Sequence, residues 1–315
     1  MLAALETKKL VKAYNGVAVV DHLDITVYNG ELVGLLGPNG AGKTTTIRML
    51  CTILVPDGGS ASVLGHDVQK EKMAVRGLIG VAPQEHAVYE ALTARENVKF
   101  IAAMHGVPST EASARADEIL DKLGLKDRHD KVKNFSGGMK RRLDLAMATV
   151  MDPEVLFLDE PTAGLDPQAR HVVWDYIKEL KARGKAILLT THDMVEADML
   201  SDRVVIIDRG KILDQGTPRE LKERYGEANV AEMRCKNASD IAVLREKISK
   251  LDFVTFTHVN GDLVLSVNFN GGAMNFARLL NQGLGGDLSL VETLSLRQTT
   301  LEDVFLRLTG RRLRE

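Results

Sequence analysis

The chain has 315 residues, 44% of them hydrophobic, which is enough for one large domain and a smaller second one. Its 41 basic and 43 acidic residues leave a net charge of −2, so no global electrostatic argument favours a nucleic-acid partner. Cys51 and Cys235 match neither a disulfide framework nor a zinc motif, and no apolar stretch reaches bilayer-spanning length. We expect a soluble cytosolic protein without a signal peptide or a metal cluster, which reaches a membrane only through a partner.

The first thirty residues alternate apolar and polar side chains, as Leu23, Ile25 and Val27 do, and this predicts an antiparallel β-layer. Tyr14 ends one of these strands. Its ring is able to stack on a base, but a lone tyrosine at a strand end more often packs against its neighbours. The residues alone therefore favour packing.

A glycine-rich segment then matches the pattern G-x-x-x-x-G-K-[ST] in full. Its residues are Gly37, Pro38, Asn39, Gly40, Ala41, Gly42, Lys43 and Thr44. An apolar strand (32–36) precedes it and a helix (44–50) follows, whereas the dinucleotide pattern G-x-G-x-x-G has no match here. The glycines allow backbone N–H groups to surround phosphates, Lys43 adds a positive charge, and Thr44 offers a hydroxyl to Mg2+. The segment predicts a bound nucleoside triphosphate.

The next core strand (78–83) ends at Gln84, at a strand terminus where α/β proteins place functional groups. Taken by itself, Gln84 would be an ordinary loop residue. Three helical patterns follow at 94–104, 111–123 and 139–150, and they predict a helical insertion between two core strands, at about 86–150.

A second glycine-rich turn precedes the last of these helices. Ser136 is a good N-cap residue, and Gly137 and Gly138 free the backbone to meet a ligand. The three basic residues at 140–142 lie where the helix dipole normally favours acids. A visiting anion and a solvated basic face explain these charges equally well.

An unbroken apolar strand (155–158) ends in two carboxylates, Asp159 and Glu160. Beside a phosphate loop this pair predicts a Mg2+ ligand, Asp159, and a group that polarises the attacking water, Glu160. Asp166 then caps a helix that begins with Pro167, and another core strand (186–191) leads to His192. Alone, His192 is a modest candidate.

The character of the chain changes beyond about residue 225. Strands and helices are expected in the order β-α-β-β-α-β up to a strand at 288–296, with a final helix at 300–308. This order resembles a ferredoxin-like layer and contains no acid, base or metal constellation. We expect residues 226–315 to form an accessory α+β domain with a regulatory or interface role.

These motifs together, in this order, resemble the ATPase subunit of an ABC transporter over about residues 1–225. The resemblance implies a P-loop NTPase α/β core with an antiparallel β-layer, and bound ATP and Mg2+. It places Tyr14 against adenine, which reverses the packing interpretation, and assigns Thr45 and Asp166 to the nucleotide site. It makes Gln84 a metal ligand and a catalytic residue linked to the membrane subunit, and His192 the γ-phosphate switch.

The resemblance further implies that Ser136, Gly137 and Gly138 meet the γ-phosphate on a second copy of the chain, so that two ATP molecules lie in a head-to-tail dimer. Phe135 and Met139 stand where the family signature commonly has Leu and Gln. The resemblance therefore does not extend to contacts made by that Gln, whereas Glu160 and His192 are intact and imply two hydrolysis-competent sites.

The segment 299–310 is similar to the tail of daunorubicin-resistance exporter ATPases of the ABC-2 type. That similarity implies export, a separate transmembrane permease and a position on the cytoplasmic face of the membrane. Two alternatives remain: a soluble ABC ATPase that does not act in transport, and a binding-only regulator, against which the intact Glu160 and His192 argue.

Overall fold

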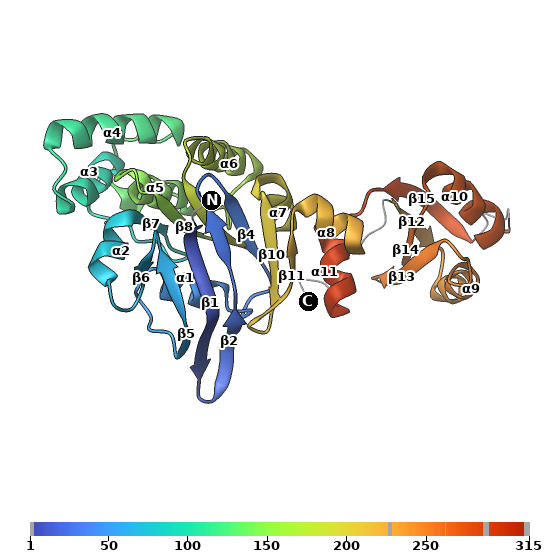
Figure 1. Cartoon of the computed structure of the whole chain (residues 1–315). Coiled ribbons are helices and arrows are strands. Elements are labelled where there is room, and N and C mark those ends of the chain that lie inside the picture. Colours follow the sequence, from blue (N-terminus) through green and yellow to red (C-terminus); the bar gives the residue numbers. More distant parts are fainter. Residues whose placement is uncertain (1–2, 226–228, 262, 286–289, 312–315) are drawn as a thin grey trace. The chain divides into compact units, whose positions relative to one another are not determined.

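The computed structural model describes residues 3–225, 229–261, 263–285 and 290–311. The chain divides into two compact units, Met1–Gln215 and Gly216–Glu315 (Figure 1). This division precedes the predicted boundary at 225, because helix α8 (Pro218–Tyr225) packs against α11 (Leu301–Thr309) within the second unit.

The first unit is built on a six-stranded sheet with the order β11-β10-β4-β9-β8-β7. Its strands are β4 (Leu32–Leu36), β7 (Ile79–Ala82), β8 (Val155–Asp159), β9 (Ala186–Thr191), β10 (Arg203–Asp208) and β11 (Lys211–Gly216). The pairs from β10 to β7 are parallel, and every residue of β4, β8 and β9 is buried. Burial on both faces explains why these strands are continuous apolar runs.

A second sheet confirms the predicted antiparallel layer. Strand β1 (Ala3–Tyr14) lies between β2 (Val17–Leu23) and β5 (Gly58–Val63), β5 also pairs with β6 (His66–Asp67), and β3 (Thr26–Tyr28) pairs with β1. The sheet packs against the face of the central sheet that carries Val155 and Phe157 of β8, together with Val33 and Leu35 of β4.

Helices cover the other face of the central sheet. Leu156 and Leu158 of β8 point to that face and join a separate core with helical residues. The helices of the first unit are α1 (Lys43–Leu50), α2 (Lys72–Leu78), α3 (Ala94–Met104), α4 (Ser109–Lys122), α5 (Gly137–Thr149), α6 (Pro167–Ala182) and α7 (Met194–Leu200), with a 3-10 turn at Val132–Asn134. Helices α3, α4 and α5 pack on one another and confirm the predicted helical insertion.

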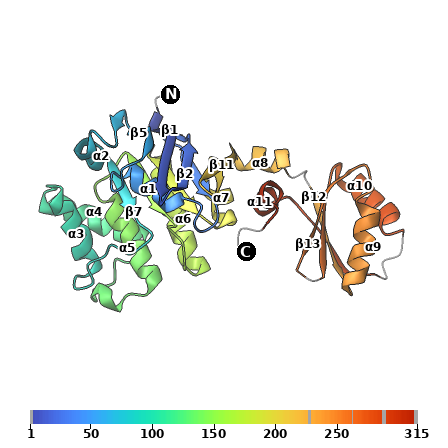
Figure 2. The ribbon, with the colours of Figure 1, turned by 90° about the horizontal axis from the view of Figure 1, so that it is seen from below.

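The second unit has the predicted order β-α-β-β-α-β. Its elements are β12 (Asn229–Cys235), α9 (Ala238–Ile248), β13 (Val254–Asn260), β14 (Val264–Phe269), α10 (Gly272–Arg278), a π-helical turn (Leu279–Gly283), β15 (Val291–Arg297) and α11. The antiparallel sheet has the order β13-β14-β12-β15, which confirms the ferredoxin-like layer. Residues 288 and 289 of the predicted last strand lie outside the described residues. Helices α9 and α10 lie on one side of the sheet and α11 on the other (Figure 2).

Candidate functional site

The phosphate loop connects the carboxyl end of β4 to the first residue of α1, as predicted. Gly42 caps α1 with a φ of +103°, and a Cβ at this position would lie 2.4 Å from the carbonyl oxygen of Val19. A Cβ on Gly37 would lie 2.4 Å from the carbonyl oxygen of Ile207. Both positions therefore require glycine, and the loop backbone is free to turn its N–H groups toward an anion.

The remaining loop residues occupy the positions that the motif predicts. Asn39 and Gly40 form an exposed tip, and the N–H of Ala41 donates to the carbonyl oxygen of Pro38 at 3.2 Å. Thr45 is half-buried in the first turn of α1. The loop is thus open at its tip and closed by packing at its base.

Lys43 is 5% exposed, and its side chain folds back onto the phosphate loop. Its Nζ donates to the carbonyl oxygens of Gly37, at 2.7 Å, and Pro38, at 3.0 Å, and lies 3.6 Å from Oε1 of Glu160. Burial lowers the pKa of Lys43, while the carboxylates of Glu160 and Asp159 act in the opposite direction. The carboxylates therefore support a cation at the centre of the loop.

Three oxygen-bearing side chains meet beside Lys43. The hydroxyl of Thr44 lies 3.2 Å from Oδ1 of Asp159 and 3.3 Å from Oε1 of Gln84. A hydroxyl, a carboxylate and an amide oxygen are hard ligands of the kind that Mg2+ takes. The three predicted metal ligands thus come together from three separate segments and fit that ion.

Glu160 follows β8 in a left-handed backbone conformation, with a φ of +52°. Its Oε1 lies 3.1 Å from Nδ1 of His192, within ion-pair distance but without hydrogen-bond geometry. His192 follows the neighbouring strand β9, so the structure brings two of the three predicted catalytic side chains, Glu160 and His192, together at the carboxyl ends of adjacent strands.

Thr190 is a site residue that sequence reasoning missed. This fully buried hydroxyl donates to Oδ1 of Asp159 at 2.5 Å and accepts from the N–H of Glu160 at 3.1 Å. The only hint of Thr190 in the sequence is its position two residues before His192 on a core strand. This hint is weak, because the sequence does not say which strand lies beside β8. Thr190 fixes both acidic residues at once.

A second missed group connects the loop after Glu160 to helix α7. Glu196, in the first turn of α7, is 1% exposed and accepts from the hydroxyl of Thr162 at 2.6 Å and from Nε1 of Trp174 at 3.2 Å. Burial raises the pKa of Glu196, and the hydrogen bonds from Thr162 and other donors oppose this shift. The carboxyl holds the loop at 161–166 to the helix that follows His192.

The basic residues at the start of α5 have protein partners. Arg141 is 6% exposed and donates to the carbonyl oxygens of Pro83 and Gln84, each at 2.6 Å. Lys140 pairs with Glu90, and Arg142 donates to the carbonyl oxygen of Leu123. These bonds account for the three charges without a visiting anion, and Arg141 fixes the backbone of the Gln84 loop.

Five predicted site residues lie apart from this cluster. Ser136 caps α5 by accepting from the N–H of Met139, and Asp166 caps α6 by accepting from the N–H of Ala169. Gly137 and Gly138 form the first turn of α5, and Tyr14, 47% exposed, ends β1 with Lys12 over its ring. Among the described residues, no hydrogen bond or ion pair joins these five to the phosphate loop or to the acidic pair.

A phosphate loop on a parallel sheet, with an oxygen ligand set and a carboxylate at the adjacent strand end, defines a P-loop nucleotide-binding protein. The comparisons with known proteins identify the family. A family model described as ABC transporter matches residues 20–163. A daunorubicin/doxorubicin resistance ATP-binding protein of Streptomyces peucetius is 44% identical over 98% of this chain and 92% of its own length. Nod factor export ATP-binding protein I of Paraburkholderia xenovorans is 40% identical over 99% of both chains.

A solved ATP-binding subunit of an ABC transporter has the same fold. It is 31% identical and superposes with a TM-score of 0.66 over 70% of this chain and 93% of its own. A dimeric cassette with ADP and phosphate, 23% identical with a TM-score of 0.63, covers 68% of this chain and 98% of its own and shares the fold. The chain belongs to the ABC transporter family and is an ATP-binding ATPase, which confirms the family predicted from the motifs. The alternative prediction of a soluble ABC ATPase outside transport is not favoured.

Proposed function

We propose that the chain is the ATP-hydrolysing subunit of an exporter and acts as a pair of identical copies beneath a separate transmembrane permease, on the cytoplasmic face of the membrane. The names of the relatives, drug resistance and Nod factor export, support the direction of transport. In the described part of the chain no helix combines the length and hydrophobicity needed to cross a bilayer. The membrane path of the cargo accordingly belongs to the permease.

One observation supports the proposal of a dimer: the chain contains two parts of a nucleotide site, and no hydrogen bond or ion pair joins them among the described residues. Lys43, Thr44 and Glu160 form one part, and the exposed Ser136 and Gly137 at the start of α5 form the other. Backbone N–H groups at a helix N-terminus suit a phosphate. A second copy placed head to tail would bring its α5 to the phosphate loop of the first and complete the site.

Within that site the side chains have separate roles. Lys43 binds the terminal phosphates, Thr44, Asp159 and Gln84 hold Mg2+, and Glu160 orients the attacking water and accepts its proton. Mg2+, when bound, neutralises charge on the phosphate oxygens. His192, beside Glu160, contacts the γ-phosphate.

The remaining roles concern the nucleotide base and the closure of the dimer. Tyr14 stacks on adenine, and Thr45 and Asp166 contact the nucleotide. The γ-phosphate bridges two copies, so binding closes the dimer and hydrolysis reopens it.

The Gln84 loop offers the contact to the permease. Pro83 and Ala87 of this loop border a cavity of about 280 Å3 whose other walls include Tyr89, Ile101 and Met147. Because Arg141 holds the same loop at Pro83 and Gln84, a permease segment seated here would bear directly on a metal ligand. Purification from detergent-solubilised membranes should therefore recover a polytopic partner with the ATPase.

Replacement of Glu160 by glutamine tests the catalytic role. The variant should lose about 100-fold or more of its turnover, the range for removal of a general base. It should also form a stable dimer with ATP and Mg2+, measured by light scattering after gel filtration. Glu111→Gln, on the surface of α4, is the matched control and should keep its turnover. A Glu160→Gln chain that stays monomeric and hydrolyses ATP normally would disprove the assignment.

Mixing two inactive variants tests whether the site is shared between copies. Lys43→Ala removes the phosphate-loop charge, and Gly137→Glu puts a carboxylate at a position where a Cβ meets no atom within 4 Å. Each variant alone should be inactive, whereas a mixed dimer has one intact site and should regain activity. Continued inactivity of the mixture, with both variants folded, would argue for a site within one chain.

A further inference from the structure

Tyr14 lies at an end of β1 that the neighbouring strand β5 does not reach. β5 begins at Gly58, which pairs with Val11, so residues 12–14 extend past it. The pairing of β1 with β2 on the other side changes register before and after Lys12. Irregular pairing interrupts the ladder of backbone hydrogen bonds, so this end of the strand needs other contacts to hold it in place.

Asp57, the residue before β5, supplies these contacts. Its N–H donates to the carbonyl oxygen of Val11 at 2.9 Å. Its Oδ2 accepts from the N–H of Ala13 and its Oδ1 from Nζ of Lys12, both at 2.8 Å. The hydrogen bond from Ala13, and then that from Lys12, lower the pKa of Asp57. One ionised carboxylate thus holds the two residues that precede Tyr14.

The ammonium group of Lys12 covers one face of the Tyr14 ring. Its Nζ lies 5.6 Å from the ring centroid and also donates to the carbonyl oxygen of Val55 at 2.9 Å. A cation over an aromatic face at this distance is attracted to the ring. The side chain of Lys12 is only 13% exposed and is held by these partners, whereas Tyr14 remains 47% exposed. The ring is therefore supported from one side.

The strand pair that carries Tyr14 also contacts the phosphate loop. A Cβ on Gly42 would lie 2.4 Å from the carbonyl oxygen of Val19 on β2. Tyr14 pairs with Val17, two residues along β2 from Val19. Two residues of a strand span about 7 Å. One nucleotide can therefore reach the ring with its base and the loop with its phosphates.

We propose that Lys12 and Asp57 are positioning residues for the nucleotide base, an inference that rests on the stacking role proposed for Tyr14. They hold the ring in one orientation, so that adenine stacks on the face opposite Lys12. Among the described residues, no hydrogen bond or ion pair joins either side chain to Lys43 or Glu160. Loss of either positioning residue therefore weakens binding of the base and leaves the chemical step unaltered.

Calorimetric titration of the full chain with ADP and with pyrophosphate, each with Mg2+, tests the two positioning roles. Pyrophosphate keeps the phosphates and lacks the base. Lys12→Met should weaken ADP binding about two- to tenfold, the scale of the free energy needed to order one side chain, and leave pyrophosphate binding unchanged. Lys12→Arg, which keeps the charge and the donors, should recover most of the ADP affinity. Steady-state hydrolysis should show a raised KM for ATP and an unchanged kcat.

Asp57→Asn separates positioning from charge. An amide has one acceptor oxygen in place of two, so the bonds from Ala13 and Lys12 cannot both remain as they are. The variant also removes a negative charge, which by itself would strengthen the binding of an anion. Positioning predicts the opposite, weaker ADP binding by about the same factor as in Lys12→Met.

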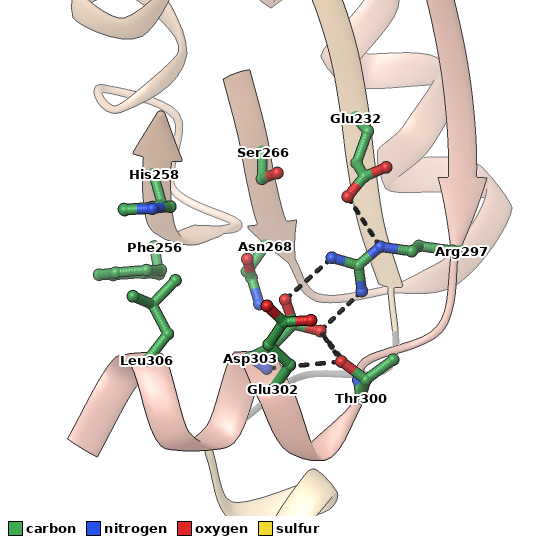
Figure 3. A pocket seen from close by; sticks show the side chains of 10 residues that line it. All are labelled: Glu232, Phe256, His258, Ser266, Asn268, Arg297, Thr300, Glu302, Asp303 and Leu306. Carbon is green, nitrogen blue, oxygen red and sulfur yellow. Dashed lines mark hydrogen bonds and ion pairs between the residues drawn. The ribbon is translucent and has the colours of Figure 1, made fainter. Parts of the chain in front are cut away.

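Asp303→Asn is the matched control for Asp57→Asn. The carboxylate of Asp303 also accepts from a basic side chain, Arg297, and from a backbone N–H, that of Thr300, but it lies in the second unit (Figure 3). The control should bind ADP and pyrophosphate as the unaltered chain does.

Three results would overturn the proposal. One is an equal loss of ADP and pyrophosphate affinity in Lys12→Met, because the lysine would then attract the phosphates by its charge. Another is unchanged ADP affinity in either Lys12→Met or Asp57→Asn, with weaker ADP binding in Tyr14→Ala. This result leaves the stacking role of Tyr14 standing, and it decides the matter even if only one of the two variants folds. The third is unchanged ADP affinity in Tyr14→Ala, which would refute the stacking role and the two positioning roles together.

Discussion

Replacement of Thr190 by valine keeps the shape of the side chain and removes one hydroxyl group. That hydroxyl donates to Asp159 at 2.5 Å and accepts from the N–H of Glu160 at 3.1 Å, in a fully buried position. The Glu160 N–H also donates to the backbone carbonyl oxygen of residue 190 at 3.0 Å, and this bond survives the substitution. The principal loss is therefore one hydrogen bond to a charged carboxylate.

A hydrogen bond to a charged group contributes about 1.5–3 kcal/mol. If the whole of this free energy positions Asp159 and Glu160 in the transition state, Thr190→Val lowers kcat by about 10- to 100-fold, since 1.36 kcal/mol corresponds to tenfold. The free energy of unfolding should fall by no more than the same amount. Glu160→Gln removes the reacting group itself and should cost more activity than Thr190→Val.

Phosphate release at saturating ATP, measured across a Mg2+ titration, gives kcat, and thermal unfolding gives the stability. Thr149→Val is the matched control: this threonine is 5% exposed, and its hydroxyl bonds to Leu145, Ala146 and Tyr176 away from the site. The control should lose stability and keep its kcat per folded molecule. If Thr190→Val also keeps its kcat, the hydroxyl does not position the acidic pair and the reasoning fails.

Two further predictions concern burial and backbone strain. Burial raises the pKa of Glu196, so its contribution to stability is present below the carboxyl's ordinary pKa of 4.5 and is lost as pH rises through the raised value. Glu196→Gln imitates the protonated form, and its thermal stability should fall less than that of the unaltered chain above pH 4.5; parallel pH curves would contradict this. Gly42→Ala should abolish binding of a fluorescent ATP analogue, because the φ of +103° costs about 1–2 kcal/mol and the new Cβ would meet Val19 at 2.4 Å. Gly40→Ala is its control, because Gly40 has a φ of +80° but no atom within 4 Å of a new Cβ. Gly40→Ala should bind the analogue more tightly than Gly42→Ala does.

The nucleotide-binding half of the site could be predicted because it depends on consecutive residues. The strand, the loop Gly37–Thr44 and the helix after it are a local pattern, and so is the apolar strand that ends in Asp159 and Glu160. Local hydrogen bonding and backbone conformation decide such segments, so their residue types carry the information. The β-α-β-β-α-β order of the second unit was predictable for the same reason.

Long-range packing decided the rest. Thr44 and Asp159 are 115 residues apart in the sequence, and Arg141 donates to the carbonyl oxygen of Gln84, 57 residues before it. The sequence left two explanations open for the charges at 140–142. In the structure Arg141 and Arg142 donate to backbone carbonyl oxygens, and Lys140 pairs with the carboxylate of Glu90. Thr190 carried no distinctive motif at all.

The amino-acid sequence by itself predicted the phosphate loop and determined which strands are buried. It did not determine that β9 lies between β4 and β8, because fully apolar strands present the same surface to any neighbour. Only the tertiary structure sets this order, which brings Thr190 and His192 to the acidic pair. Strand order results from the packing of both faces at once, and no single segment contains that information.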